Sequence, residues 1–100
     1  MESAYEKALV YELKKIGLEI KRQIYLLVLY KEMTIENAYK VDLIVNDKVI
    51  VEIKSVLELH AVFYSQLTTY LKLTNLKLGL LINFNTPLIK DEIHRIVNKL

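Results

Sequence analysis

Three charged side chains stand out because each interrupts an apolar stretch that otherwise has the composition of a β-strand. Asp42, Glu52 and Lys54 lie within residues 41–54, which read VDLIVNDKVIVEIK. Two neighbouring carboxylates repel each other, and they offer the hard oxygen ligands that Mg²⁺ takes in proteins, to which the backbone carbonyl of Ile53 could add a further ligand. A cation held there lowers the pKa of a bound water and neutralises charge on a phosphoryl oxygen. An ammonium group beside it could orient the attacking water or stabilise the transition state.

A β-hairpin would bring the two carboxylates together. Two β-branched runs flank residues 46–48, which read Asn-Asp-Lys, and this composition is typical of a hairpin turn. A loop of these three residues pairs Val45 with Val49. The same register sets Asp42 directly opposite Glu52, with about 5 Å between their Cβ atoms. The lysine two residues after the glutamate shares its face of the strand, so we expect all three charged groups on one face. The alternative interpretation is a set of edge-strand charges that prevent aggregation.

Helical spacing places two further polar residues near this site. A helix over residues 2–16 is indicated by apolar residues three and four apart, and Gly17 supplies its end. Glu2 lies at the edge of the apolar stripe and points toward the sheet, or it is only a favourable first-turn charge. Gln66 lies inside the apolar face of a second helix, where it is aimed at the carboxylates or bonded to sheet-edge backbone.

The rest of the chain predicts a sheet built around this hairpin. An apolar segment near the end of the chain, LKLGLLIN, has the composition of a strand buried on both faces. It completes a strand–helix–strand crossover between parallel strands. The tail is ambiguous, because Ile89, Ile93 and Leu100 keep helical spacing while its β-branched residues also suit an edge strand. The expected elements are strands at 20–30, 34–45, 48–54 and 76–83, a turn at 31–33, and a helix at 58–74.

Composition restricts the class of protein. The chain of 100 residues suits a single domain, 1–100, and its 53% hydrophobic content with 14 basic and 12 acidic residues indicates a globular fold. The absence of cysteine excludes disulfides and thiolate metal sites. No apolar run approaches the roughly 20 residues of a membrane span, and the N-terminus lacks the apolar core of a signal peptide. We therefore expect a cytoplasmic protein without a membrane partner. A net charge of +2 neither supports nor excludes a nucleic-acid partner.

The chain resembles the PD-(D/E)XK nuclease superfamily and, within it, the small bacterial and archaeal GxxExxY proteins. The resemblance is carried by ESAYEKALVYEL, YKVDLIVNDKVIVEIKSV, SQLTTYLKLTNLKLGLLINF and the closing RIVN, so it covers nearly the whole chain. It implies an α/β fold with a restriction-endonuclease-like α-β-β-β-α-β core, in which helices flank a mixed sheet. This order agrees with the order of elements that the residue pattern predicts.

The resemblance also implies a role for each candidate residue. Asp42 and Glu52 match the metal-binding carboxylates, and Lys54 matches the catalytic lysine. Glu2 matches the acid of the ExxY motif, which lies near the metal. Gln66 matches the helical glutamine that follows the core motif. The glycine of the motif would fall before residue 1.

These observations together predict a Mg²⁺- or Mn²⁺-dependent nuclease that hydrolyses phosphodiester bonds in DNA. So small a chain offers little surface to a duplex, so we also expect a homodimer. The alternative is a catalytically silent nucleic-acid-binding or protein-interaction domain that retains the fold. The two functions differ in whether a divalent cation raises the melting temperature through this site.

Overall fold

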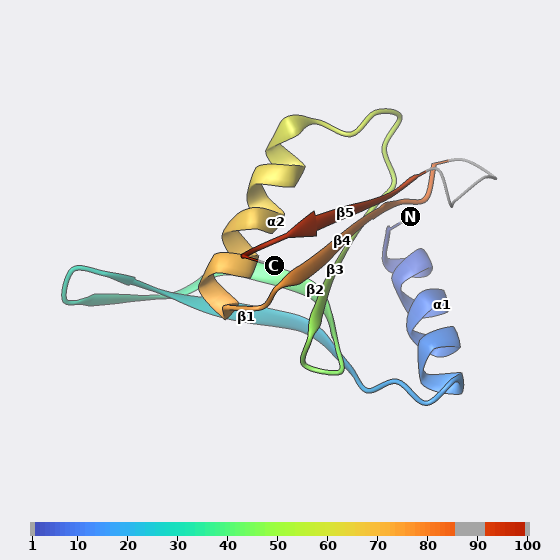
Figure 1. Cartoon of the computed structure of the whole chain (residues 1–100), viewed down its shortest axis with the longest axis horizontal. Helices are drawn as coiled ribbons and strands as arrows, with labels where there is room; N and C mark the ends of the chain where they lie inside the picture. Colours follow the sequence, from blue (N-terminus) through green and yellow to red (C-terminus); the bar gives the residue numbers. More distant parts are fainter. Residues whose placement is uncertain (1, 86–91, 100) are drawn as a thin grey trace.

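The chain folds around one mixed sheet with a helix on each face (Figure 1). The computed structural model describes residues 2–85 and 92–99. The strands follow the order β1-β2-β3-β4-β5 across the sheet, in which β3 and β4 are parallel and the other neighbours are antiparallel. The predicted α/β fold class with a restriction-endonuclease-like core is confirmed. The elements are α1 (Glu2–Lys15), β1 (Ile20–Tyr30), β2 (Met33–Val45), β3 (Val49–Lys54), α2 (Ala61–Thr74), β4 (Leu78–Asn83) and β5 (Ile93–Val97).

Neither described helix is long and apolar enough to cross a membrane.

Several predicted boundaries shift by one to three residues. The turn after β1 is shorter than expected, because Lys31 adopts a left-handed conformation with φ 55° and Tyr30 pairs directly with Met33. Helix α2 begins at residue 61 instead of 58. The preceding segment is held by the Asn83 side chain, which accepts a hydrogen bond from the Val56 N–H (3.0 Å) and donates one to the Val56 carbonyl (2.9 Å).

The ambiguous tail forms a strand over its described part. Residues 93–97 pair antiparallel with β4, in the register that sets Ile82 beside Ile93 and Leu78 beside Val97. An unpaired edge of β4 would leave backbone donors and acceptors without partners, so sheet pairing outweighs the helical spacing. Ile89 and Leu100 of this tail lie outside the described residues.

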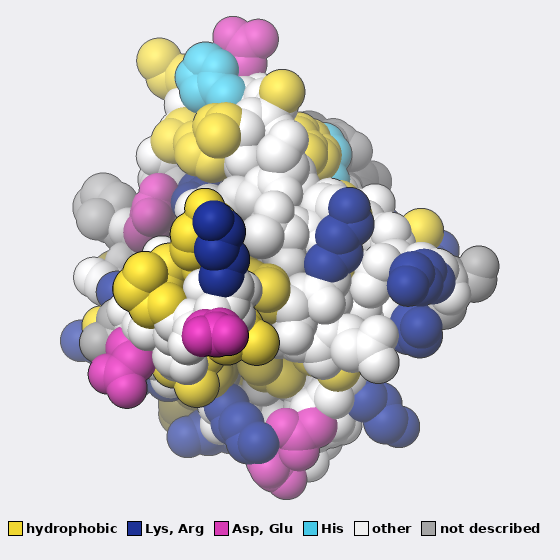
Figure 2. Space-filling view, turned by 90° about the vertical axis from the view of Figure 1, so that its left-hand side faces the viewer, with side chains coloured by type: hydrophobic (Ala, Val, Ile, Leu, Met, Phe, Trp, Pro, Cys, Tyr) yellow, Lys and Arg dark blue, Asp and Glu magenta, His cyan; other side chains and the backbone are white. Residues whose placement is uncertain are grey.

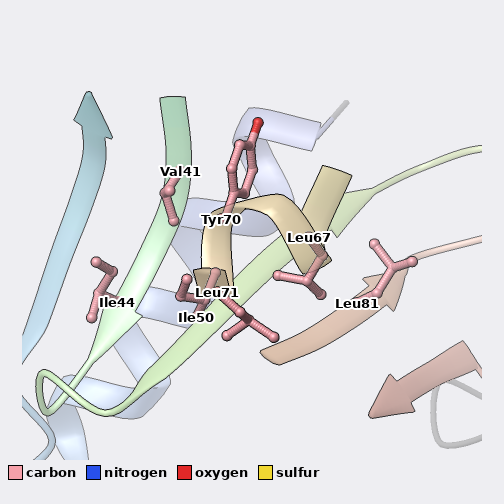
Figure 3. Close-up of a cluster of buried hydrophobic side chains, with 7 residues drawn as sticks. All are labelled: Val41, Ile44, Ile50, Leu67, Tyr70, Leu71 and Leu81. Carbon is pink, nitrogen blue, oxygen red and sulfur yellow. The ribbon is translucent and has the colours of Figure 1, made fainter. Parts of the chain in front are cut away.

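The sheet buries an apolar cluster on each face, and the two helices cover them. On the α2 side, the cluster draws on β2, β3, α2 and β4, as Figure 3 shows. On the α1 side, the packing residues come from α1, β2, β3 and β4. Because β2, β3 and β4 contribute to both clusters, these three strands form the centre of the fold. The α2-side cluster consists of Val41, Ile44, Ile50, Leu67, Tyr70, Leu71 and Leu81, and the α1-side cluster of Val10, Leu43, Val45, Val51, Ile53 and Ile82.

Gly79 permits the close contact between β4 and α2. A Cβ atom at this position would lie 2.9, 3.0 and 3.1 Å from three side-chain carbons of Leu67, which is fully buried. We therefore expect Gly79→Ala to lower the free energy of unfolding by about 1–3 kcal/mol through overpacking, as measured by urea denaturation. The compensated variant Gly79→Ala/Leu67→Val should recover part of this loss. Equal stability of Gly79→Ala and the wild type would show that the helix yields at this contact.

Candidate functional site

The β2–β3 hairpin positions the candidate carboxylates. Asn46 and Asp47 both adopt left-handed conformations, with φ 52° and 54°, which their short polar side chains tolerate better than most. Val45 therefore pairs with Val49 across the turn, as the three-residue loop predicts. The paired register extends to Leu43 and Val51 and stops there.

Beyond this register, the side chains of Asp42 and Glu52 accept hydrogen bonds from backbone N–H groups that would otherwise bond backbone carbonyls. The Asp42 N–H donates to Glu52 Oε1 at 3.0 Å. In return, the Ile53 N–H donates to Asp42 Oδ2 at 2.9 Å. One oxygen of each carboxylate is thus held by the opposite strand. The structure brings the two acids together and fixes their orientation, and these hydrogen bonds leave Asp42 Oδ1 and Glu52 Oε2 unused.

The close approach of the two acids perturbs the charge of Glu52. Its side chain is buried, with 4% of the residue exposed. Burial, and after it the negative charge of Asp42, raises the pKa of Glu52 to about 8. The hydrogen bond from the Asp42 N–H and the positive charge of Lys54 oppose the shift without cancelling it. A buried acid beside a second acid is an arrangement that a cation would stabilise.

A pocket of about 480 Å³ opens beside Asp42 on the α1 side of the sheet. Its wall is polar, and it includes Ile53, whose carbonyl is a predicted ligand. Three helix residues from α1 close one side of it. The lining residues are Glu2, Ser3, Glu6, Gln23, Lys40, Asp42, Ile53 and Ser55.

The first turn of α1 is anchored at this pocket. Tyr5 stacks on Phe84 at the end of β4, with 4.7 Å between ring centroids and an interplanar angle of 11°. Glu2, one turn earlier, accepts a hydrogen bond from the Ser55 N–H at 3.1 Å. The predicted orientation of Glu2 toward the sheet is therefore observed, and the tyrosine of the ExxY motif holds the helix that carries it.

The three charged groups do not share one face of the hairpin, so this prediction is wrong. Leu43 packs in the α1-side cluster and Val41 in the α2-side cluster, although residues two apart on a regular strand face the same side. The regular alternation of side chains between the two faces of the sheet is therefore broken at Asp42, which lines the α1-side pocket. The ammonium group of Lys54 instead lies 4.6 Å from the ring centroid of Phe63, at the start of α2.

The shift in β2 has a counterpart in β1. Gln23 lies opposite Asp42, between the pairs Arg22–Leu43 and Ile24–Val41, and it adopts φ 51°. Such a conformation is uncommon for glutamine and reverses the faces of the residues that follow. Both strands thus change phase at the same level, which directs Gln23 and Asp42 into the pocket.

A buried polar network that was not predicted from the sequence lies beside the carboxylates. Glu6 is 4% exposed, and its Oε2 accepts hydrogen bonds from Arg22 Nε (3.0 Å) and Nη2 (2.6 Å). Gln23 Nε2 donates to the other oxygen of Glu6. Among the described residues, Gln23 Oε1 is the buried side-chain atom that lacks a hydrogen-bond partner. The signal that could have identified this network is the polar run Lys21-Arg22-Gln23 near the start of an otherwise apolar strand.

Helix α2 approaches the carboxylates through Tyr70, one turn after Gln66. Burial raises the pKa of Tyr70 to about 12, and the nearby charges of Glu52 and Asp42 act in the same direction. The Tyr70 ring also contacts Tyr39 edge-on, at 5.7 Å between centroids. Gln66 is half-buried and is not among the residues that line the pocket, so its catalytic role stays a prediction.

The donor set suits a divalent cation of the Mg²⁺ type. Within residues 2–85 and 92–99, no three acidic, histidine or cysteine side chains gather closely enough to hold a metal. Glu2 lines the pocket and accepts the Ser55 N–H through one carboxylate oxygen, but it does not lie close enough to the other two acids to form such a group. Mg²⁺ commonly binds through one or two carboxylates and completes its shell with water and phosphate oxygens. Asp42 and Glu52 meet that requirement.

Comparison with known proteins places this arrangement in a family. Residues 1–96 match the PD-(D/E)XK nuclease superfamily. The crystal structure of SSO0001 is similar in fold, with a TM-score of 0.71 and 19% sequence identity over 99% of this chain. The present chain spans 51% of that protein. No curated protein matches the chain. Since the family match covers nearly every residue, including all those that line the pocket, the chain belongs to the PD-(D/E)XK nuclease superfamily.

Proposed function

We propose that this protein is a Mg²⁺- or Mn²⁺-dependent nuclease that hydrolyses phosphodiester bonds in DNA. The observation that carries the proposal is the pair of carboxylates, Asp42 and Glu52, each held by a backbone N–H of the opposite strand, with Asp42 lining an open pocket. Membership of the superfamily supports a nucleic-acid substrate. The choice of DNA and the GxxExxY subgroup rest on the resemblance of the sequence.

Three charged residues divide the chemistry of the candidate site among them. Asp42 and Glu52 would hold the cation through the oxygens that the backbone leaves unused. When bound, the cation supplies a water of lowered pKa and neutralises charge on the phosphoryl group. A bond forms between the water oxygen and phosphorus while the bond from phosphorus to the leaving sugar oxygen breaks, and that oxygen takes up a proton. Lys54, whose charge already acts on Glu52, would stabilise the negative charge that develops on the phosphoryl oxygens.

The positions of Lys54 and Gln66 favour a second candidate function. The Lys54 ammonium lies over the Phe63 ring on the α2 side, and Gln66 does not line the pocket. If these placements persist when nucleic acid is bound, the domain binds its partner without cleaving it. We therefore retain a catalytically silent nucleic-acid-binding or protein-interaction domain as the alternative.

A thermal titration with Mg²⁺ or Mn²⁺ tests the metal site without requiring the right substrate. We expect the melting temperature of the wild type to rise by several degrees at saturation, because a ligand that binds only the folded state stabilises it. Asp42→Asn should lose this rise, since one of the two acidic ligands becomes neutral. Asp47→Asn, in the exposed turn of the same hairpin, should keep it. A wild type that does not respond to either cation would favour the silent domain.

A further inference from the structure

The outer part of the β1–β2 hairpin projects from the body of the protein. We call residues 27–36 the arm; Leu26, just before it, still packs against the α2-side cluster. Figure 1 shows the arm at the left of the view, clear of both helices and of the other strands. It lies along the longest axis of the molecule, which measures 47 Å against 31 and 29 Å for the others. The arm is therefore a two-stranded ribbon without intramolecular cover.

The arm is apolar although it is exposed. Leu29 is 73% exposed, and Tyr30 and Met33, which pair across the turn, are 55% and 57% exposed. Val28 pairs with Ile35 on the same face as Tyr30 and Met33, because the two pairs lie two residues apart. This face of the arm thus carries four apolar side chains in succession. Figure 2, which looks at the molecule from the side of the arm, shows hydrophobic side chains gathered there with a few charges among them.

An uncovered apolar ribbon of this kind is not stable by itself in water. An isolated two-stranded hairpin is marginally stable, and it becomes stable when its apolar face packs against another element. Large contiguous apolar patches on a soluble protein mark interaction sites. Within the described ranges, seven of the fourteen exposed large hydrophobic residues lie from Tyr25 to Tyr39, so the exposure is concentrated in this hairpin rather than scattered over the surface.

The charges of the arm identify its partner as a protein surface. Within the arm, the single positive charge of Lys31 is outnumbered by the negative charges of Glu32 and Glu36, so the arm has no positive excess with which to contact phosphates or an anionic membrane. The apolar face is flanked by both signs of charge and is therefore complementary to itself. Two arms that pack face to face would cover Tyr30, Met33 and Ile35 of both copies, which are 55%, 57% and 39% exposed.

We propose that the arm is the dimerisation element of this protein, and that the apolar faces of two arms pack together about a two-fold axis. The inference does not depend on the proposed nuclease activity. It does bear on the site, because Gln23 and Lys40, where the hairpin joins the sheet, line the pocket. A dimer formed through the arms would fix the distance between two such pockets.

Sedimentation velocity across roughly 1 to 100 μM protein tests the proposal. We expect the wild type to dimerise, and we expect Tyr30→Thr/Met33→Thr to weaken the dimer roughly tenfold or more. Threonine keeps strand propensity and pairs well across strands, so the hairpin itself should persist. The control Tyr11→Thr/Val62→Thr removes apolar residues of similar exposure outside the arm and should leave dimerisation unchanged. A monomeric wild type, or a threonine variant with unaltered dimerisation, would overturn the proposal.

Chemical cross-linking provides a second test that does not alter the apolar face. The chain has no cysteine, so single cysteines can be placed at will. Glu32→Cys, in the turn of the arm, should form a covalent dimer with a bismaleimide reagent, whereas Leu57→Cys, at a position 93% exposed on the body, should remain monomeric. Equal cross-linking at the two positions would contradict an interface through the arm.

Discussion

Replacement of Asp42 by Asn should lower the rate of cation-dependent cleavage by roughly a thousandfold or more, because it removes one of two charged ligands for the catalytic metal. The fold should persist in this variant. The Asn side-chain oxygen can still accept the hydrogen bond that the Ile53 N–H donates to Asp42. The neutral side chain also removes the repulsion with Glu52 that raises the pKa of that acid. The measurement is cleavage of labelled DNA and RNA, single-stranded and duplex, with Mg²⁺ or Mn²⁺.

The matched control for this experiment is Asp47→Asn. It removes the same charge from the same hairpin, where Asp47 forms an exposed ion pair with Lys21 at 2.7 Å. Exposed ion pairs contribute little to stability, so this variant should cleave like the wild type. Cleavage by Asp42→Asn at the wild-type rate would contradict a metal held by this carboxylate. Unaltered cleavage and metal dependence in Lys54→Ala would contradict the proposed role of the lysine.

The hairpin that holds the carboxylates could be predicted because the residues that determine it lie within one short segment of the sequence. Two β-branched runs and an Asn-Asp turn determine a three-residue loop, and the structure pairs Val45 with Val49 as this loop requires. From that register, the proximity of Asp42 and Glu52 follows by counting residues. The β-α-β crossover was predictable for a similar reason, since a long apolar strand and an amphipathic helix are each visible within their own segments.

The environment of the site could not be predicted in the same way, because long-range contacts determine it. The reversal of the strand faces depends on the left-handed conformation of Gln23. A glycine or asparagine at this position would have suggested such a conformation, but a glutamine does not. The Glu6–Arg22 pair joins a helix to a strand sixteen residues away, and no spacing rule connects them. Lys54 shares a face with Glu52 in any regular strand, but the shift at Asp42 moves the partner carboxylate toward the other side. Local patterns therefore identified the acids, and tertiary packing decided what surrounds them.

In the metal-free protein, folding stability should fall as the pH rises from about 5 to about 8, and Glu52 should account for most of this fall. The folded-state pKa of Glu52 is raised to about 8 from an ordinary value of 4.5, chiefly by burial. Between these values the folded state holds a proton that the unfolded state has released. Stability is therefore greatest below the unfolded pKa and declines until the pH passes the folded pKa. A shift of this size corresponds to a few kcal/mol.

Urea denaturation in the presence of EDTA at pH 5 and pH 8 would measure this difference. Glu52→Gln should remove most of the decline, because the amide has no proton to release, and it should be the more stable protein at pH 8. Glu58→Gln replaces an exposed carboxyl group six residues away and should leave the decline unchanged. Added Mg²⁺ should raise the stability of the wild type at pH 8, because the cation binds the ionised carboxylate. It should not raise the stability of Glu52→Gln. A wild type equally stable at both pH values would show that Glu52 ionises without cost, and the buried acid pair would then not require a cation.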